Sequence, residues 1–143
     1  METDKKVDCL IIDSDKNDQD LLIQYCKNIK LFRHIVTAVD GIEATIKLKN
    51  QRFGLVIIDI NTPKKDALKI ISGLKHDSSI NKKAAILMTS GDLKEGQLAT
   101  AIRSGVKSYI FKPLNENNFI KKVHSIVCKE TPIVVDKSFI YKK

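Results

Sequence analysis

Five short apolar runs alternate with five longer segments of helical periodicity, and no other feature of the sequence constrains the fold as strongly. The apolar runs lie at residues 7–12, 34–38, 55–59, 84–88 and 108–111. All but the second are nearly continuous in apolar character, which is typical of parallel strands covered on both faces. The alternation predicts repeated βα units around a parallel sheet, with right-handed crossovers that place helices on both sides.

The segments between these runs carry apolar residues at helical spacing. The residues expected to face the core are Leu22, Cys26 and Ile29; Ile42 and Ile46; Ala67, Ile70, Ile71 and Leu74; Leu98, Ala101 and Ile102; and Phe119, Ile120, Val123, Ile126 and Val127. Asn115 stands where it can cap the free backbone N–H groups of the fifth helix. Burying each large side chain contributes roughly 1.5–3 kcal/mol, so packing rather than helix propensity holds these helices.

The size of the chain indicates one domain. Its 143 residues, 43% of them hydrophobic, can fill a single core. No apolar run approaches the roughly 20 residues that span a bilayer, and the start of the chain lacks the apolar stretch of a secretory signal. We therefore expect a soluble, cytoplasmic protein with no membrane partner. The three cysteines have neither redox nor zinc-site spacing, so we expect reduced packing residues.

The formal net charge of +8 raises the question of nucleic-acid binding, because clustered lysine and arginine attract phosphate backbones. The cations are instead spread along the chain, with only short pairs such as Lys82-Lys83 and Lys121-Lys122. No aromatic residues are interleaved with them, and no DNA-reading motif is present. A solvated surface explains this pattern, and we predict no nucleic-acid partner.

Two of the predicted strands end on acids. The run 55–59 finishes on Asp59, and Asp13 directly follows the run 7–12. Open α/β folds bind ligands at the carboxyl ends of their strands, and the first and third strands can be neighbours, so we expect the two acids to meet. Adjacent carboxylates persist when a cation bridges them, and such oxygen ligands suit magnesium. The alternative is that Asp13 and Asp15 only cap the helix that follows.

The fourth and fifth predicted strands end on a hydroxyl and an amine. Thr89 follows the fourth, and Lys112, which precedes Pro113, follows the fifth. Each of these residues alone is commonly a cap or loop residue. Acid, acid, hydroxyl and amine at four strand ends together predict a reactive site, with Asp59 as the leading candidate for the reactive group.

Over about residues 5–128 the chain resembles the receiver domain of two-component response regulators. The matching residues are Asp13, Asp59, Asn61, Pro63, Asp66, Thr89, Tyr109, Lys112 and Pro113. The segment 59–66 is similar to the small regulators paired with bacterial phytochromes. The resemblance implies a flavodoxin-like, doubly wound (βα)5 sandwich with a parallel five-stranded sheet of order 2-1-3-4-5. It also implies a receiver domain at 1–128 and a tail at 129–143, with no separate output domain.

The resemblance further implies a phosphoacceptor. Asp59 would take a phosphoryl group from a sensor histidine kinase or a phosphotransfer protein, forming an aspartyl phosphate. Asp59, Asp13 and the backbone carbonyl of Asn61 would hold Mg²⁺, while Lys112 and the Thr89 hydroxyl would contact phosphoryl oxygens. Such a protein shows magnesium-dependent self-phosphorylation and self-dephosphorylation rather than conventional enzyme activity. In this family the bond before the proline that follows the lysine is cis.

A conformational switch is the second implication of the family. The residues in its two switch positions are Thr89 and Tyr109. We expect the altered surface to comprise the fourth helix, fifth strand and fifth helix, whose basic residues include Lys94, Arg103 and Lys107. A homodimer or an acidic partner is expected to dock there.

One departure from the family pattern concerns the metal site. Receivers usually carry a second acid directly after the first, and the corresponding residue here is Ser14, a weaker and neutral ligand. Ser14, through its hydroxyl or a bound water, or Asp15 would have to complete the site, and weaker metal binding is expected. The departure keeps open a pseudo-receiver that binds proteins without being phosphorylated. A flavin-binding protein of the same strand order is disfavoured, because the acids after the first strand would repel its phosphate.

Overall fold

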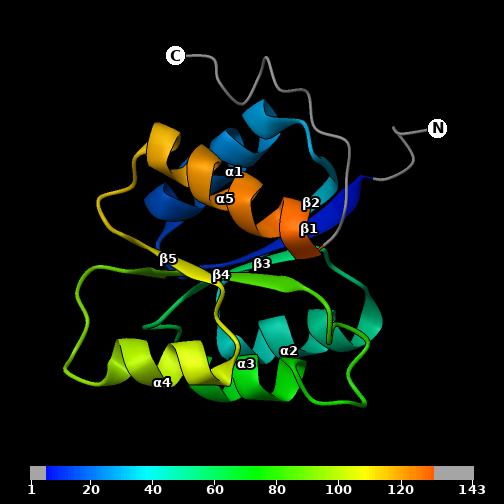
Figure 1. The fold of residues 1–143 in the computed structure, drawn as a ribbon, viewed down its shortest axis with the longest axis vertical. Coiled ribbons are helices and arrows are strands. Elements are labelled where there is room, and N and C mark those ends of the chain that lie inside the picture. Colours follow the sequence, from blue (N-terminus) through cyan, green and yellow to red (C-terminus); the bar gives the residue numbers. More distant parts are fainter. Residues whose placement is uncertain (1–5, 131–143) are drawn as a thin grey trace.

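The computed structural model describes residues 6–130, and side chains up to residue 127. It confirms the predicted alternation of strands and helices (Figure 1). The elements are β1 (Val7–Ile12), α1 (Lys16–Ile29), β2 (Phe32–Ala38), α2 (Gly41–Asn50), β3 (Leu55–Asp59), α3 (Ala67–Leu74), β4 (Ala85–Ser90), α4 (Gln97–Ser104), β5 (Ser108–Phe111) and α5 (Glu116–Glu130). The β2 strand begins earlier than predicted, and α5 continues to Glu130. Residues 131–143 of the predicted tail lie outside the described part.

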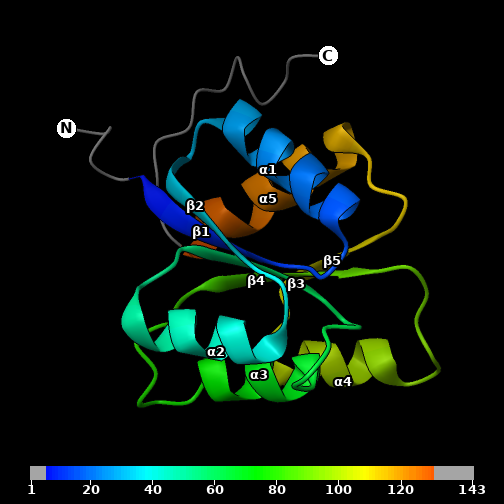
Figure 2. The same ribbon diagram turned by 180° about the vertical axis from the view of Figure 1, so that it is seen from behind.

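The strands form one parallel sheet in the order β2-β1-β3-β4-β5, as predicted. Figures 1 and 2 show α1 and α5 on one face and α2, α3 and α4 on the other, which is the doubly wound arrangement. The register pairs Ile12 with Ile58 and Asp59 with Thr89. The sheet therefore brings the ends of β1, β3 and β4 together at one edge.

The sheet separates two hydrophobic cores. Successive side chains of a strand point to opposite faces, so Leu10 and Ile12 pack toward α2, α3 and α4, whereas Cys9 and Ile11 pack toward α1 and α5. Both sets are fully buried. This two-sided burial explains why the central strands are apolar at every position rather than at every second one.

The core faces predicted for α1, α3 and α5 are confirmed, with only Ile120 of α5 partly buried. Asn115 caps α5 by accepting the N–H of Asn118 at 2.9 Å. In α4 the prediction holds for Ala101, which is fully buried, but Ile102 is 55% exposed. The Ile102 side chain, which follows Ala101, therefore points to solvent.

The prediction for α2 is wrong. Ile42 and Ile46 are 54% and 56% exposed, and the helix buries Gly41 and Ala44 instead. The reason is close packing at the start of the helix. A Cβ atom on Gly41 would lie 2.6 Å from the Cβ of Lys65, so no larger residue fits at this position, and further along the helix the partly buried Leu48 packs against the core. The large isoleucines are left on the outer side.

Two of the three cysteines are described, and both are free and buried, as predicted. The sulfur atoms of Cys9 and Cys26 lie 4.0 Å apart in the core between the sheet and α1. Burial raises the pKa of the Cys9 thiol, so it stays protonated at neutral pH. Among residues 6–130, no helix has the length and apolar character needed to cross a bilayer.

Candidate functional site

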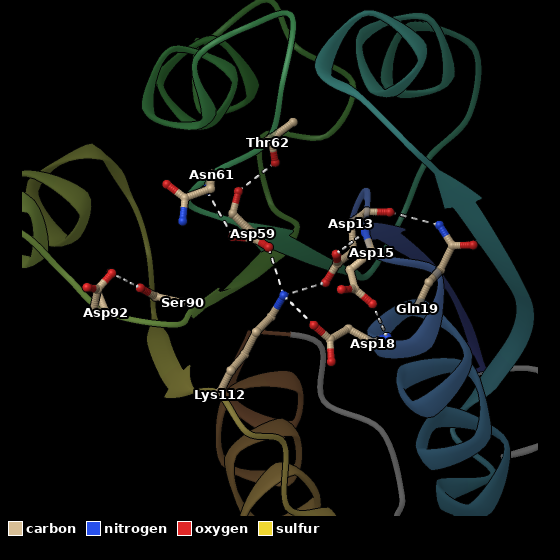
Figure 3. A network of polar contacts seen from close by, with 10 residues as sticks. All are labelled: Asp13, Asp15, Asp18, Gln19, Asp59, Asn61, Thr62, Ser90, Asp92 and Lys112. Atoms are coloured by element: carbon tan, nitrogen blue, oxygen red, sulfur yellow. Dashed lines mark hydrogen bonds and ion pairs between the residues drawn. The ribbon is translucent and has the colours of Figure 1, made fainter.

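Three carboxylates converge on the ammonium of Lys112 at the carboxyl edge of the sheet. The Lys112 Nζ lies 2.8 Å from Asp59 Oδ2, 3.1 Å from Asp13 Oδ2 and 2.8 Å from Asp18 Oδ2. Figure 3 shows the lysine reaching across to acids from β3, the end of β1 and the first turn of α1. The expected meeting of Asp13, Asp59 and Lys112 is thus observed, and Asp18 joins them.

Asp59 is the last residue of β3, and its side chain is held from several directions. Its Oδ1 accepts the backbone N–H of Asn61 at 2.9 Å, and its carbonyl accepts the Thr62 hydroxyl at 2.5 Å. The following N–H, of Ile60, donates to the Thr89 carbonyl at 2.9 Å. These bonds fix the turn after β3, so that the carboxylate points to Lys112. Asp59 is buried, and 12% of its side-chain surface remains exposed at the sheet edge.

Asp13 follows β1 and is 1% exposed. Its Oδ1 accepts the backbone N–H of Asp15 at 2.9 Å, and its backbone carbonyl accepts the Gln19 amide at 3.1 Å. Burial raises the pKa of the Asp13 carboxyl, and the nearby charge of Asp59 acts in the same direction, although the Asp15 N–H and Lys112 oppose it. The Lys112 ammonium therefore offsets only part of the cost of burying the negative charge of Asp13.

Lys112 leaves the end of β5, and its backbone N–H donates to the Ser90 carbonyl of β4 at 2.7 Å. The peptide bond to Pro113 is cis, as in the resembling family. Burial by itself lowers the pKa of Lys112, but the hydrogen bonds that its ammonium donates to Asp18, Asp59 and Asp13 raise it above the usual lysine range. The side chain is therefore a cation throughout the physiological range.

Thr89 and Tyr109 show how the predicted switch residues lie. Thr89 pairs with Asp59 in the sheet and is 0% exposed, and its hydroxyl has no hydrogen-bond partner among the described residues. Tyr109 is half-buried on β5. Its ring meets that of Phe111 edge to face at 5.3 Å, and the Lys122 ammonium lies 5.4 Å from the ring centre.

Ser14 and Asp15 are both exposed, and neither contacts the Lys112 ammonium as Asp13, Asp18 and Asp59 do. Asp15 is the N-cap of α1, where its Oδ1 accepts the Asp18 N–H at 3.0 Å. The capping alternative thus holds for Asp15, whereas Asp13 belongs to the acid cluster. Sequence reasoning missed Asp18. The sequence feature that could have revealed Asp18 is its place in the first turn of the helix that follows Asp13, from which its side chain can reach the same edge of the sheet.

The oxygen atoms at this edge suit a hard divalent cation. Carboxylates of Asp13 and Asp59 and the backbone carbonyl of the exposed Asn61 have the chemistry that magnesium prefers. Within residues 6–130 no three acids, histidines or cysteines are arranged as a metal-ligand set, and the Lys112 ammonium lies between Asp13 and Asp59. The Thr89 hydroxyl next to Asp59 is buried and has no hydrogen-bond partner among the described residues, so it is free to donate to an oxygen atom of a bound anion. The residues therefore fit magnesium and an oxyanion in chemistry.

A comparison with protein families defines the class. Residues 9–124 match the response regulator receiver domain, so the chain belongs to this family of two-component signal transduction proteins. The fold and the arrangement of Asp13, Asp59 and Lys112 agree with the resemblance seen in the sequence.

Curated relatives are larger than the matching part. The chain is 33% identical over 93 residues to the chemotaxis protein CheY of Treponema pallidum, covering 64% of this chain and 62% of that protein. It is 30% identical over 128 residues to the regulatory protein VirG of Agrobacterium tumefaciens, covering 88% of this chain and 45% of that one. It is 22% identical to the hybrid signal transduction histidine kinase G of Dictyostelium discoideum, covering 89% of this chain but 4% of the kinase. The chain thus spans less than two thirds of each relative.

Solved structures share the fold. The receiver domain of a sensor histidine kinase from Pseudomonas aeruginosa PAO1, which has a magnesium ion coordinated in its active site cleft, matches with a TM-score of 0.73 at 15% identity. The match covers 85% of this chain and 98% of that one. The phosphorylated cyanobacterial phytochrome response regulator RcpA matches with a TM-score of 0.71 at 24% identity, covering 84% and 90% of the two chains.

Proposed function

We infer that Asp59 accepts a phosphoryl group from the phosphohistidine of a partner kinase or phosphotransfer protein. The observation that carries this proposal is the contact between Lys112 Nζ and Asp59 Oδ2 at 2.8 Å, which joins residues 53 positions apart in the chain. The Asp59 carboxylate lies at the sheet edge beside the Lys112 ammonium. If Asp59 is phosphorylated, this ammonium can compensate the negative charge of the phosphoryl group.

The transfer exchanges one bond to phosphorus for another. A carboxylate oxygen of Asp59 forms the new P–O bond while the P–N bond to the partner histidine breaks and its electron pair returns to the ring nitrogen. The Asn61 N–H contacts one carboxylate oxygen and orients the nucleophile, and before a cation binds the Lys112 ammonium contacts the other oxygen. After transfer the Lys112 ammonium pairs with a phosphoryl oxygen, and the Thr89 hydroxyl gains the partner that it lacks.

Asp13, Asp59 and the Asn61 carbonyl are the residues that would hold magnesium. When bound, the cation supplies positive charge that offsets the incoming phosphoryl group. The magnesium-containing structure of a related fold is consistent with this choice, as is the oxygen-only chemistry of the residues. The chain's own contribution is to aim Asp59, to keep Lys112 charged and to place the Thr89 hydroxyl beside them.

Intact-mass measurement after incubation with acetyl phosphate and Mg²⁺ tests the proposal. We expect the native protein to gain the mass of one phosphoryl group and Asp59→Asn to gain none. Asp66→Asn is the matched control, because Asp66 is an exposed acid in the same loop whose side chain makes no capping bond. It should be labelled like the native protein.

The alternative is a pseudo-receiver that binds partners without phosphorylation, and the specific observation in its favour is the neutral Ser14. If neither acetyl phosphate nor a phosphorylated histidine kinase transfers a phosphoryl group to the native protein in the presence of Mg²⁺, this alternative replaces the proposal.

A further inference from the structure

The site lacks an acid at Ser14, but the structure provides another acid one helical turn away. Ser14 is exposed, and the carboxylate of Asp15 is engaged in capping α1. The side chain of Asp18 instead turns toward the sheet edge and contacts Lys112 Nζ at 2.8 Å (Figure 3). The third carboxylate of the site thus comes from the first turn of α1.

We propose that Asp18 is a positioning residue that replaces the carboxylate missing at position 14, by holding the Lys112 ammonium while Asp13 and Asp59 bind a divalent cation. The proposal rests on the function inferred above for the site. It assigns to Asp18 an effect on cation affinity that neither the family match nor the sequence pattern indicates.

Competition for oxygen atoms is the first argument. The Oδ2 atoms of Asp13 and Asp59 contact the ammonium at 3.1 and 2.8 Å, so a cation that binds these carboxylates competes with Lys112. Like charges at short range repel, and the ammonium has to withdraw from both oxygens. Asp18 gives it a partner during this withdrawal. At 24% exposure the Asp18 side chain is also the most solvated of the three acids, so pairing there costs the least desolvation.

Charge balance is the second argument. Three ionised carboxylates around one ammonium leave two negative charges, which is the amount that a divalent cation neutralises. Without Asp18 a single negative charge remains, and the unpaired ammonium repels the incoming cation. Both effects lower cation affinity, so the sign of the expected change is fixed.

The position of Asp18 on α1 is the third argument. It lies in the first turn, where the positive end of the helix favours a carboxylate, and its backbone N–H is held by Asp15 at 3.0 Å. Asp18→Asn retains this N–H and the size of the side chain, so the substitution removes the charge and leaves the helix start in place.

Calorimetric titration of the full chain with Mg²⁺ tests the proposal. We expect Asp18→Asn to weaken Mg²⁺ binding by about tenfold or more, the scale on which groups behind metal ligands act. Asp20→Asn is the control, because Asp20 lies on the same helix but pairs with the exposed Lys16 at 2.8 Å. It removes the same charge and should change the affinity by less than about twofold, since solvent screens exposed charges.

Restoring an acid at position 14 gives the second measurement. Ser14→Asp should recover most of the lost affinity in the Asp18→Asn background. In the native protein it should add little, in contrast to the weaker metal binding that Ser14 alone predicts, because the third carboxylate is then already present. Unchanged Mg²⁺ affinity in Asp18→Asn, or failure of Ser14→Asp to rescue it, overturns the proposal. Circular dichroism checks that each variant is folded. If the native protein neither binds Mg²⁺ nor takes up a phosphoryl group, the proposed function itself fails; if it does both and Asp18→Asn behaves identically, only the present inference fails.

Discussion

The hydroxyl of Thr89 is buried at the site and has no hydrogen-bond partner among residues 6–130, in contrast to that of Thr62, which donates to the Asp59 carbonyl at 2.5 Å. An unsatisfied buried polar group costs about 1–3 kcal/mol. We therefore expect Thr89→Val to raise the free energy of unfolding of the metal-free protein by about 1 kcal/mol, because the methyl group has the same shape and needs no hydrogen bond.

Thr62→Val is the matched control and should lower the free energy of unfolding by a similar amount, since it removes a hydrogen bond that is made. Urea unfolding followed by circular dichroism measures both. Equal signs for the two substitutions would contradict the assignment of Thr89 as unpartnered. A Thr89 hydroxyl that lowers the stability of the unphosphorylated protein is consistent with its proposed contact with a phosphoryl oxygen on Asp59.

Individual site residues differ in how far the sequence reveals them. Asp13, Asp59 and Lys112 were predictable because each ends an apolar strand, and parallel strands present their carboxyl ends at one edge. Asp18 was not, because an acid in the first turn of a helix ordinarily serves the helix end alone. Only the distance of 2.8 Å to Lys112 separates the two possibilities.

At the scale of the element, β1 carries acids of opposite character near its two ends. Asp8 is 4% exposed; burial alone would raise its pKa, but hydrogen bonds from Arg33 and Gln51 and the charge of Arg33 lower it below the usual 3.8. The pKa of Asp13 is raised above 3.8, mainly by burial. Ionised Asp8 therefore stabilises the fold above pH 3.8, and this stability is lost as the pH falls through its lowered pKa. Ionised Asp13 costs stability above its raised pKa, and the cost disappears as the pH falls through that value toward 3.8.

Charge-removing substitutions should show these signs. At neutral pH and without metal, we expect Asp8→Asn to lower the free energy of unfolding and Asp13→Asn to raise it, each by on the order of 1 kcal/mol, because Arg33 is solvent-exposed and one ammonium already offsets part of the Asp13 charge. The Asp13→Asn difference should shrink as the pH is lowered toward about 4, whereas the Asp8→Asn difference should persist to about 4 and shrink only below 3.8. Urea titrations across this range measure them. The same sign for both substitutions at neutral pH would contradict the assignment.

Helix α2 shows where sequence patterns fail at this scale. Ile42 and Ile46 have the spacing of a core face, yet they point outward, because the close contact at Gly41 brings Gly41 and Ala44 to the inner side, with Leu48 partly buried further along. Hydrophobicity ranks large residues above small ones, whereas the close approach of a helix to a loop selects for small size. The faces of α1, α3 and α5 were predictable, because burial there is limited by apolar surface rather than by space, whereas the order of the strands was implied by the resemblance to receiver domains.

At the scale of the whole molecule, β5 connects the site to the α4, β5 and α5 surface, where the resemblance predicts that a partner docks. Lys112 directly follows Phe111, whose side chain is 50% exposed, and Tyr109 packs edge to face on Phe111 at 5.3 Å. If Lys112 exchanges Asp13 and Asp59 for a phosphoryl oxygen, as proposed above, we expect the end of β5 to adjust. A phosphoryl group alters output only if it favours one of two such packings.

We therefore expect the protein to self-associate through α4, β5 and α5 when Asp59 carries the phosphoryl mimic beryllofluoride with Mg²⁺. Exposed aromatic residues dominate such interfaces, with truncations that cost about 2 kcal/mol or more, so Phe111→Ala should weaken dimerisation by at least about 30-fold. Ile46→Ala is the control, because Ile46 is similarly exposed, at 56%, on the remote helix α2. Sedimentation velocity with and without beryllofluoride measures all three proteins. A mimic-dependent dimer that persists in Phe111→Ala but is lost in Ile46→Ala would place the interface on α2 instead. No change in sedimentation in any of them would leave an acidic partner as the ligand of this face, since Arg103 and Lys122 lie on α4 and α5 and supply the complementary charge.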